Sequence, residues 1–294
     1  MTVQLALEES DLAPVTQAGS DTLVFAPDLS YRRMSIVNVI FYGNPSKKNE
    51  WVLIDTGLPT SANAIIEAAE HRFGGGTSPA AIIMTHGHFD HAGSLAALAE
   101  RWDVAVYAHP LEFPYLNGEA SYPPADPLVG GGAMALLSPL FPRSPVNVAS
   151  RLKVLPPDHS IPVMPGWRWL HTPGHAPGHI SLWRESDRTL IAGDAVVTTG
   201  QESVYEVIVQ KPEMHGPPRY FTPDWDEAGK SVRALAALEP DLVITGHGRP
   251  VRGPNMRRRL HELANNFASI AVPEGRPYAL DPAKPGKSGN DAYR

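Results

Sequence analysis

The sequence predicts an α/β protein built as a four-layer αββα sandwich of two pseudo-symmetric halves. The main observation is an order of elements that occurs twice. An apolar strand ending in aspartate, a helix, and a second apolar strand that runs into a histidine span residues 51–87 and recur over residues 190–248. Two such halves would form two sheets, each covered by helices on its outer side. In both halves the polar residues follow a strand, where loops gather to form sites.

In the first half, β-branched and apolar runs predict strands, and helical spacing of apolar residues predicts helices. Ser35–Tyr42 and Trp51–Ile54 flank a turn-rich Gly-Asn-Pro segment, as in paired strands. The apolar positions of Ser61–Phe73 recur at helical spacing and are followed by three glycines. The other predicted elements are strands over Ala80–Met84 and Val104–Ala108 and a helix over Ser94–Trp102.

The second half repeats this plan. Its predicted strands are Trp167–His171, Ile180–Trp183, Thr189–Ala192 and Leu242–Ile244, and its predicted helices are Asp224–Leu238 and Asn255–Phe267. We therefore predict one domain over residues 21–272, after an N-terminal extension over residues 1–20. The Pro- and Gly-rich stretch within residues 110–150 is expected to form a lid-like insertion, and the polar residues 273–294 a flexible tail.

Composition excludes several classes of function. The chain has 294 residues with 31 acidic and 25 basic side chains, and its net charge of −6 argues against a nucleic-acid partner. It has no cysteine, which excludes thiolate zinc sites, iron–sulfur clusters, disulfides and cysteine nucleophiles. The N-terminus lacks the order of a signal peptide, and no apolar run reaches the roughly 18 residues of a membrane span. We expect a cytoplasmic protein without a membrane partner.

Residues 85–93 read Thr-His-Gly-His-Phe-Asp-His-Ala-Gly. A chance His-x-His-x-Asp-His in a chain of this composition is expected roughly 10⁻³ times. Imidazole nitrogen and carboxylate oxygen suit zinc and similar ions. His86 and His88 are two residues apart at a strand end and can share a face, while Asp90 and His91 can serve a second ion. Gly87 would let the backbone turn tightly, and Gly93 would let a helix start close by. The alternative is a polar loop with solvated histidines.

Three further candidates, His175, Asp194 and His247, each follow a predicted strand. Taken singly they are weak, because a histidine beside glycines is more often a turn or core residue. Together they complete two sets of ligands, with Asp194 bridging both ions through its two oxygens. The sets are His86, His88 and His175 for one ion, and Asp90, His91 and His247 for the other.

The order Thr-His-x-His-x-Asp-His, Thr-Pro-Gly-His, Gly-Asp and Gly-His over residues 85–248 resembles the metallo-β-lactamase-fold hydrolase superfamily. Residues 53–57, Leu-Ile-Asp-Thr-Gly, resemble the strand end that precedes these motifs in that family. The resemblance implies two zinc ions per chain, with iron, manganese or cobalt as other metals, held by the seven residues above. It also implies a bridging hydroxide as nucleophile, which Asp90 would orient and deprotonate. Two cations about 3.5–4 Å apart acidify a shared water, which is consistent with this chemistry.

Other residues allow more than one interpretation. Asp55 would hold a ligand imidazole in its tautomer, or would cap the following helix. His109, His171, His179 and His215 have no predicted metal role, although His179 competes with His175.

Branches of the family differ at positions that this chain lets us compare. Class B1 and B2 β-lactamases carry a cysteine where Asp194 stands, so antibiotic hydrolysis is disfavoured. Glyoxalase II-type thioesterases have a basic C-terminal region, whereas Arg257–Arg259 is more typical of a solvated helix face. Some lactonases place a tyrosine three residues after the bridging aspartate, where this chain has Val197, leaving Tyr205 or Tyr220 as substitutes.

The predicted function is hydrolysis of an ester, lactone or thioester of a small molecule with a hydrophobic acyl part. This preference comes from apolar residues of the predicted lid, although aromatic residues in long loops more often anchor the loop. An iron-dependent oxidoreductase resembling persulfide dioxygenases and a non-catalytic metal-binding protein are the alternatives. Family habit also suggests a homodimer that uses the lid or the tail. The lid residues concerned are Phe113, Tyr115, Tyr122, Leu136, Leu137, Leu140 and Phe141.

Overall fold

The computed structural model describes residues 5–283, which form two compact units. The N-terminal unit comprises Pro14–Ser121 and Arg143–Trp167. The C-terminal unit comprises residues 5–13, Tyr122–Pro142 and residues 168–283. The predicted extension, domain and insertion stay predictions, and residues 284–294 of the predicted tail lie outside the described residues.

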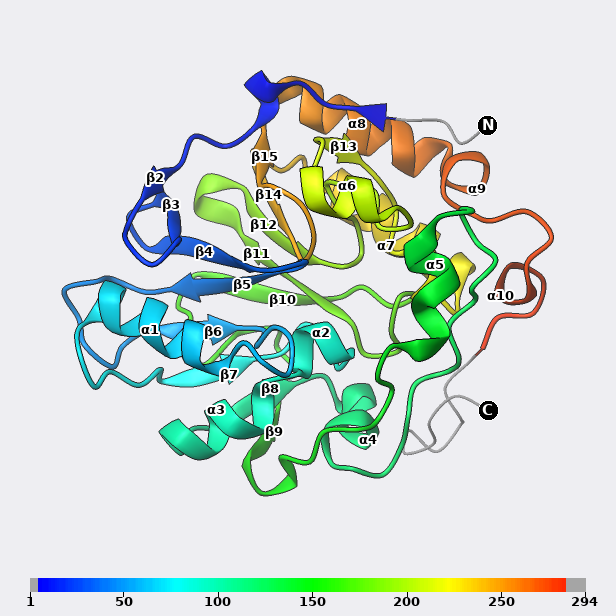
Figure 1. Cartoon of the computed structure of the whole chain (residues 1–294). Coiled ribbons are helices and arrows are strands. Elements are labelled where there is room, and N and C mark those ends of the chain that lie inside the picture. The colour runs from blue at the N-terminus through cyan, green and yellow to red at the C-terminus, as the bar shows by residue number, and fades with distance from the viewer. Residues whose placement is uncertain (1–4, 284–294) are drawn as a thin grey trace. The chain divides into compact units, whose positions relative to one another are not determined.

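One mixed sheet forms the centre of the N-terminal unit. Its strands are β2 (Thr16–Gln17), β3 (Leu23–Ala26), β4 (Leu29–Met34), β5 (Val37–Tyr42), β6 (Val52–Ile54), β7 (Ala81–Ile83), β8 (Val106–Ala108) and β9 (Leu152–Val154). Within the described residues they lie side by side in sequence order (Figure 1). Neighbours are antiparallel from β2 to β6 and parallel from β6 to β9.

Two amphipathic helices, α1 (Ala62–Phe73) and α3 (Leu95–Trp102), pack on one face of this sheet. Leu53 of the sheet, Ile65 of α1 and Leu98 of α3 are fully buried in one cluster. Trp51 stacks on Phe73 with ring centroids 4.8 Å apart, which fixes the end of α1 against the sheet. The shorter helical segments are α2 (Phe89–Ala92), η2 (Pro110–Glu112), α4 (Phe113–Leu116) and η4 (Ala149–Arg151).

The C-terminal unit contains a second mixed sheet. Its strands, in spatial order, are β10 (Trp167–His171), β11 (Ile180–Arg184), β12 (Thr189–Gly193), β14 (Leu242–Thr245) and β15 (Val251–Arg252). Strand β12 runs parallel to β14, and both have antiparallel neighbours, β11 and β15. A separate pair joins β1 (Leu5–Ala6) to β13 (Glu213–Met214).

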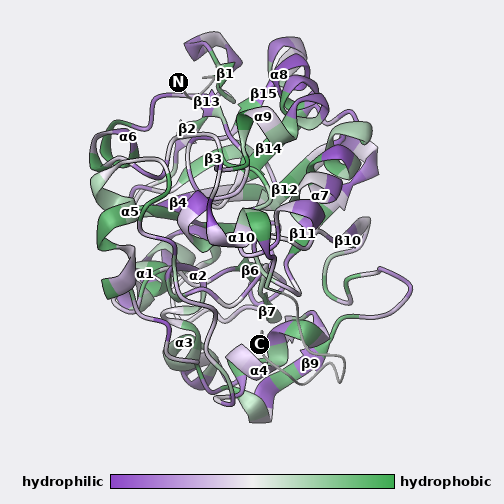
Figure 2. Ribbon diagram, turned by 90° about the vertical axis from the view of Figure 1, so that its right-hand side faces the viewer, coloured by the Kyte–Doolittle hydropathy of each residue, from purple (hydrophilic) through white to green (hydrophobic). Residues whose placement is uncertain are grey.

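Helices α7 (Trp225–Ala237) and α8 (Gly253–Asn265) cover this second sheet. Both mix hydrophilic and hydrophobic residues along their length (Figure 2). Their apolar residues, including Val232 and Leu260, join Leu190 and Val243 of the strands in a buried cluster. The other helical segments are η1 (Glu9–Asp11), α5 (Ala133–Leu137), η3 (Ser138–Leu140), η5 (Glu185–Asp187), α6 (Val204–Val209), η6 (Arg219–Phe221), α9 (Phe267–Ile270) and α10 (Pro277–Leu280).

The repeated plan inferred from the sequence is present in each unit. Strand β6 pairs in parallel with β7, and β12 pairs in parallel with β14. Strands β2–β4 were not predicted from the sequence, nor were the helices α4 and α5 within the predicted lid-like insertion. Helices of about one turn are too short to show a periodic apolar pattern, so the sequence does not predict them. Within residues 5–283, no helix has the length and apolar composition needed to cross a bilayer.

Candidate metal site

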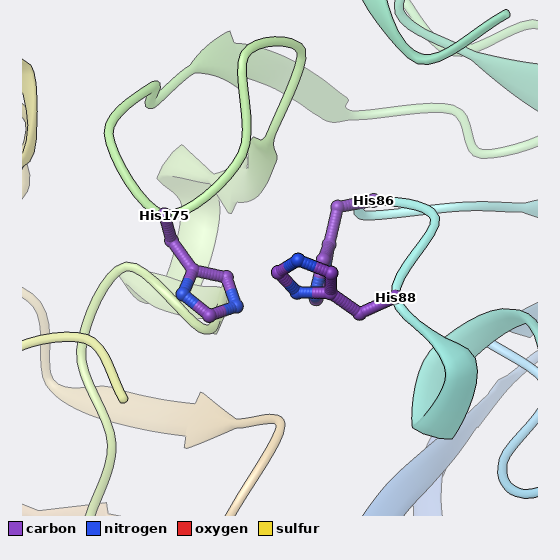
Figure 3. A group of neighbouring side chains, drawn as sticks. All are labelled: His86, His88 and His175. Carbon is purple, nitrogen blue, oxygen red and sulfur yellow. The ribbon is translucent and has the colours of Figure 1, made fainter. Parts of the chain in front are cut away.

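Four predicted ligands lie on the segment that follows β7 in the N-terminal unit. This segment, residues 86–91, is called the donor loop below; it carries His86, His88, Asp90 and His91. All four side chains are buried, and the most exposed, Asp90, is 8% exposed. The ring centroid of His86 lies 4.7 Å from that of His88 and 4.2 Å from that of His91. The short spacing in sequence therefore gathers three imidazoles in one place, and Figure 3 shows His86 and His88 close together on this loop.

Asp55, which follows β6, hydrogen-bonds to the ring of His91. Its Oδ2 lies 2.8 Å from His91 Nδ1, and its two oxygens also accept the backbone N–H and the hydroxyl of Thr85. A carboxylate at Nδ1 places the proton there and leaves a lone pair on Nε2, the form in which histidine binds a metal. Helix α1 begins at Ala62 with Ser61 at its N-cap, so the capping alternative for Asp55 is wrong.

Glu112 is a buried carboxylate that the sequence analysis missed. It lies in η2 with 0% exposure, and its Oε2 accepts the backbone N–H of Gly87 at 2.9 Å. The bond fixes the donor loop between His86 and His88. A contact across 25 residues, made from a segment without periodic pattern, leaves no local signal in the sequence.

Gly93 fixes the other end of the donor loop. A Cβ on this residue would lie 2.4 Å from the backbone nitrogen of Pro59 and 2.5 Å from the carbonyl carbon of Leu58. Its N–H also donates to the carbonyl of Gly57 at 2.9 Å. Only glycine fits there without backbone movement, and helix α3 begins two residues later, at Leu95, as the sequence predicts.

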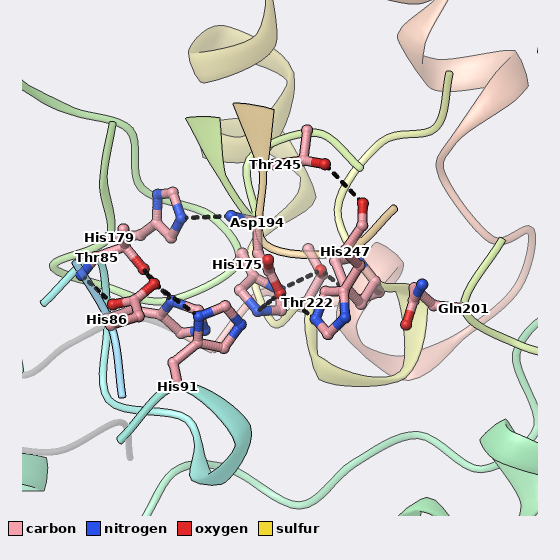
Figure 4. Close-up of polar contacts among 12 residues, drawn as sticks. Thr85, His86, His91, His175, His179, Asp194, Gln201, Thr222, Thr245 and His247 are labelled. Atoms are coloured by element: carbon pink, nitrogen blue, oxygen red, sulfur yellow. Dashed lines mark hydrogen bonds and ion pairs between the residues drawn. The ribbon is translucent and has the colours of Figure 1, made fainter. Parts of the chain in front are cut away.

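The C-terminal unit holds the other three predicted ligands, called the carboxylate cluster below. Asp194 Oδ2 lies 3.1 Å from His247 Nε2 and 3.5 Å from His175 Nε2. Each of these residues is 2% exposed. Asp194 follows β12 and His247 follows β14, so the parallel pairing of these strands brings the two residues together (Figure 4). His175 comes from the loop after β10, and its Nδ1 lies 3.2 Å from Thr222 Oγ1.

His179 does not take the place of His175. Its Nε2 accepts the backbone N–H of Asp194 at 2.9 Å, and its Nδ1 lies 2.9 Å from Thr172 Oγ1. A backbone N–H can only donate, so the lone pair of Nε2 is committed to Asp194 and the ring proton resides on Nδ1. His179 therefore holds the backbone of Asp194 in position, a role that the sequence analysis did not identify.

Comparison with known proteins decides the family. The sequence profile of the metallo-beta-lactamase superfamily matches residues 32–247. This chain belongs to that superfamily. The probable metallo-hydrolase YflN of Bacillus subtilis (strain 168) is 51% identical over 237 residues, which cover 81% of this chain and 90% of YflN. The probable metallo-hydrolase YybB of the same strain is 32% identical over 199 residues, covering 68% of this chain and 76% of YybB.

A solved structure is similar as well. The crystal structure of a beta-lactamase domain protein from Burkholderia ambifaria superposes with a TM-score of 0.60 at 25% identity, covering 90% of this chain and 78% of that one. The superfamily fold, α/β with two mixed sheets flanked by helices, confirms the predicted fold class. The buried His and Asp clusters have the composition of a metal site. Together with membership of the superfamily, they support the general prediction of a metal-dependent hydrolase.

The remaining histidines have local partners. His109 Nδ1 accepts the N–H of Leu111 at 3.3 Å, which caps η2. His171 Nε2 lies 2.8 Å from the carbonyl of Pro177. His215 Nε2 lies 3.2 Å from Glu213 Oε2. These contacts give each of the three a local hydrogen-bond partner.

The residues expected to line a substrate pocket divide into buried and exposed side chains. Val197, at the lactonase tyrosine position, is 1% exposed and forms a backbone bridge with His215. Tyr220 is 6% exposed and packs on Phe221, whereas Tyr205 on α6 is 71% exposed. Of these three residues, only Tyr205 has a largely exposed side chain.

The same division runs through the predicted lid. Tyr115 and Tyr122 are 2% and 6% exposed, so they anchor their segments as loop aromatics commonly do. Leu136, Leu137 and Leu140 are exposed instead.

The arginine run on α8 is engaged with acidic neighbours. Arg257 pairs with Asp241, and Arg259 pairs with Glu262 at 2.8 Å. Their charge is compensated within the C-terminal unit, which agrees with the interpretation of this run as a solvated helix face.

Proposed function

We propose that this chain is a dinuclear zinc hydrolase that cleaves an ester, lactone or thioester of a small molecule with an apolar acyl part. The donor set carries the proposal. Five imidazoles and two carboxylates, none more than 8% exposed, occur in a chain without cysteine. Burying ionisable groups costs free energy unless they are paired or coordinate a metal. Nitrogen and oxygen donors of this kind suit zinc.

The family resemblance implies two sets of ligands drawn from the seven predicted residues, with four of them on the donor loop and three in the carboxylate cluster. When bound, the zinc pair supplies positive charge that acidifies a shared water and stabilises an oxyanion on the substrate. Asp90 orients the attacking water and takes up its proton. Asp55 and His179 keep His91 and Asp194 in place, so that neither ligand has to reorganise during the reaction.

The metal content per chain tests this proposal first. We would purify the protein without added metal and measure its metals by elemental mass spectrometry. About two zinc ions per chain, with turnover of at least one lactone, thioester or aryl ester, is the expected result. About one iron with little zinc would favour the iron-dependent oxidoreductase, which oxygen-uptake assays would then test. A well-folded protein with neither metal would contradict the proposal.

The bond type and the acyl part need a second experiment. Lactones, thioesters and aryl esters would be compared at matched acyl lengths, and each series would be extended by single methylene groups. An apolar acyl pocket predicts that kcat/KM rises with chain length, because each buried methylene contributes about 0.8 kcal/mol. A flat series would contradict the apolar part of the proposal and leave the hydrolytic part standing.

A further inference from the structure

The hydroxyl of Thr222 lies beside the predicted ligand His175 in the C-terminal unit (Figure 4). Thr222 is fully buried, and its Oγ1 donates to the carbonyl of Pro218 at 2.7 Å. A carbonyl oxygen can only accept, so the single hydroxyl hydrogen of Thr222 is used in this bond. The contact of 3.2 Å with His175 Nδ1 therefore takes its hydrogen from the imidazole ring.

This arrangement fixes the tautomer of the His175 ring. With the hydrogen on Nδ1, the lone pair lies on Nε2, the nitrogen that is 3.5 Å from Asp194 Oδ2. Asp55 has the same effect on His91, with a carboxylate in place of the hydroxyl. Thr222 thus prepares His175 to offer Nε2 to a metal ion.

The position of this hydroxyl depends on the stretch of chain that carries it. Residues 218–224, called the Thr222 segment below, include the one-turn helix η6 and no other helix or strand. A single helical turn is not stable by itself, because its few internal hydrogen bonds do not offset the entropy lost in forming it. Contacts from other parts of the unit must therefore hold the Thr222 segment in place.

Two of these contacts come directly from residues 270–283, called the C-terminal strap below. Arg219 Nη2 donates to the carbonyl of Ile270 at 2.7 Å. The N–H of Ala283 donates to the carbonyl of Pro223, the residue directly after Thr222, at 3.0 Å. The C-terminal strap therefore holds the Thr222 segment near both of its ends.

A third connection between the two runs through Asp126. Arg276 of the C-terminal strap pairs with both carboxylate oxygens of Asp126, which is 6% exposed. The backbone N–H of Asp126 in turn donates to the carbonyl of Tyr220 at 2.9 Å. A guanidinium that binds both oxygens of a carboxylate fixes its orientation as well as its distance. Arg276 thus holds the residue that supports the middle of the Thr222 segment.

We propose that the C-terminal strap positions His175 for metal binding. Thr222 is the positioning residue in contact with the ring, and Arg276 is the positioning residue that holds the Thr222 segment. The inference rests on the proposed role of His175 as a zinc ligand. Loss of the hydrogen bond that orients a ligand imidazole typically lowers metal affinity about 10- to 100-fold. The effect of the strap would pass along a continuous series of hydrogen bonds and one ion pair.

The tautomer of His175 can be tested without any metal. Protein labelled with ¹⁵N in its histidines and freed of metal with a chelator would be studied by NMR at about pH 8.5, where an ordinary imidazole is neutral. The ring signals that disappear in His175→Gln belong to His175. We expect the hydrogen on Nδ1 in the wild type and a shift toward the other tautomer in Thr222→Val. A hydrogen on Nε2 in the wild type, or an unchanged ring in Thr222→Val, would overturn the inference.

Zinc affinity, measured in competition with a chelator, tests the consequence for metal binding. Thr222→Val keeps the shape of the side chain but removes the hydroxyl, and should lower the affinity about 10-fold or more. Thr222→Ser keeps the hydroxyl but removes a methyl group, and should stay within about 3-fold of the wild type. The reverse order of the two variants would show that Thr222 acts through packing alone, against the inference. A wild type that binds no zinc would refute the proposed function, and the NMR result would then decide the role of Thr222.

Two variants test the strap itself. Arg276→Met removes the ion pair with Asp126, and Ala283→Pro removes the N–H that donates to Pro223. Each should lower zinc affinity about 3- to 10-fold, less than Thr222→Val, because it acts through the intervening segment. Each should also shift the ring signals of His175 in the metal-free protein.

Arg257→Met is the matched control for Arg276→Met. The side chains of Arg257 and Arg276 are 28% and 25% exposed, and each pairs with an aspartate of the C-terminal unit. Arg257→Met should leave zinc affinity and the His175 signals unchanged, while circular dichroism checks that all variants are folded. Equal effects of the two arginine variants, or wild-type affinity in both strap variants, would overturn the role of the strap.

Discussion

The donor loop and the carboxylate cluster are both buried sets of predicted metal ligands, but they are constructed in opposite ways. The donor loop takes four ligands from residues 86–91, a single stretch of chain. The carboxylate cluster takes its three predicted ligands from residues that are 19 and 53 positions apart, and the pairing of β12 with β14 brings together two of them, Asp194 and His247. The first depends on local backbone geometry and the second on sheet register. They should therefore respond differently to substitution.

Replacing donor-loop ligands should give the largest effect. His88→Ala and Asp90→Asn are each expected to lower kcat/KM by about 10³-fold or more, because under the proposed mechanism each removes a predicted metal ligand next to the reacting atoms. The fold should stay largely intact, as judged by circular dichroism. His159→Ala replaces an exposed histidine of the same unit and should retain wild-type activity. Wild-type-like turnover of either ligand variant would refute the mechanism.

Glycine-to-alanine substitutions test the close backbone contacts beside the donor loop and beside the carboxylate cluster. Gly174→Ala would bring a Cβ within 2.3 Å of the backbone nitrogen of Ala228, at a φ of +125°, in the loop that carries His175. In Gly93→Ala, the new Cβ would clash in a similar way with backbone atoms of Leu58 and Pro59, just after the donor loop. We expect each variant to lower the free energy of unfolding by about 3 kcal/mol in urea denaturation. Gly75→Ala, with no atom within 4 Å of its Cβ, should change it by less than about 0.5 kcal/mol.

Residues that hydrogen-bond to the predicted ligands should have intermediate effects when they are replaced. Asp55→Asn removes the charge that holds His91, and His179→Phe removes the acceptor for the N–H of Asp194. Each should lower zinc affinity about 10- to 100-fold in competition with a chelator. His179→Gln keeps an acceptor in the side chain and should recover part of that loss. Unchanged zinc affinity in His179→Phe would show that this histidine only fills space.

The smallest predicted effect concerns acid stability of the C-terminal unit. Glu213 is 3% exposed, and its contacts with His215 and then Lys211 lower the pKa of its carboxyl from 4.5 to about 2. Since the folded-state pKa lies below the unfolded one, the stabilisation is present above pH 4.5 and is lost as the pH falls toward 2. It amounts to about 1–3 kcal/mol.

Glu213→Gln tests that link on metal-free protein, where loss of zinc at low pH plays no part. The variant should be less stable than wild type at pH 7, and the difference in Tm should shrink between pH 5 and pH 3. Glu50→Gln, at an exposed position of the N-terminal unit, is the control. A difference in Tm that does not change with pH would contradict the assigned pKa.

Much of the fold and of the candidate site could be predicted because the signals are local. The parallel pairs β6–β7 and β12–β14 follow from apolar runs that end in polar residues, and the donor loop follows from one dense motif. For Asp55 the sequence left two roles open, support of a ligand and capping of a helix, and the contact with His91 decided for the first. The contact of Glu112 with Gly87 could not, since nothing near either residue indicates the other.

The sequence by itself determined the residue types and the strand ends on which the predicted ligands lie, because alternation, glycine and histidine spacing act over a few residues. Only the tertiary structure decided between His175 and His179, since the backbone N–H of Asp194 takes the lone pair of His179. It also decided which apolar residues are covered, burying Tyr115 and leaving Leu140 exposed. Burial depends on which segments pack on a side chain, and those segments are distant in the chain.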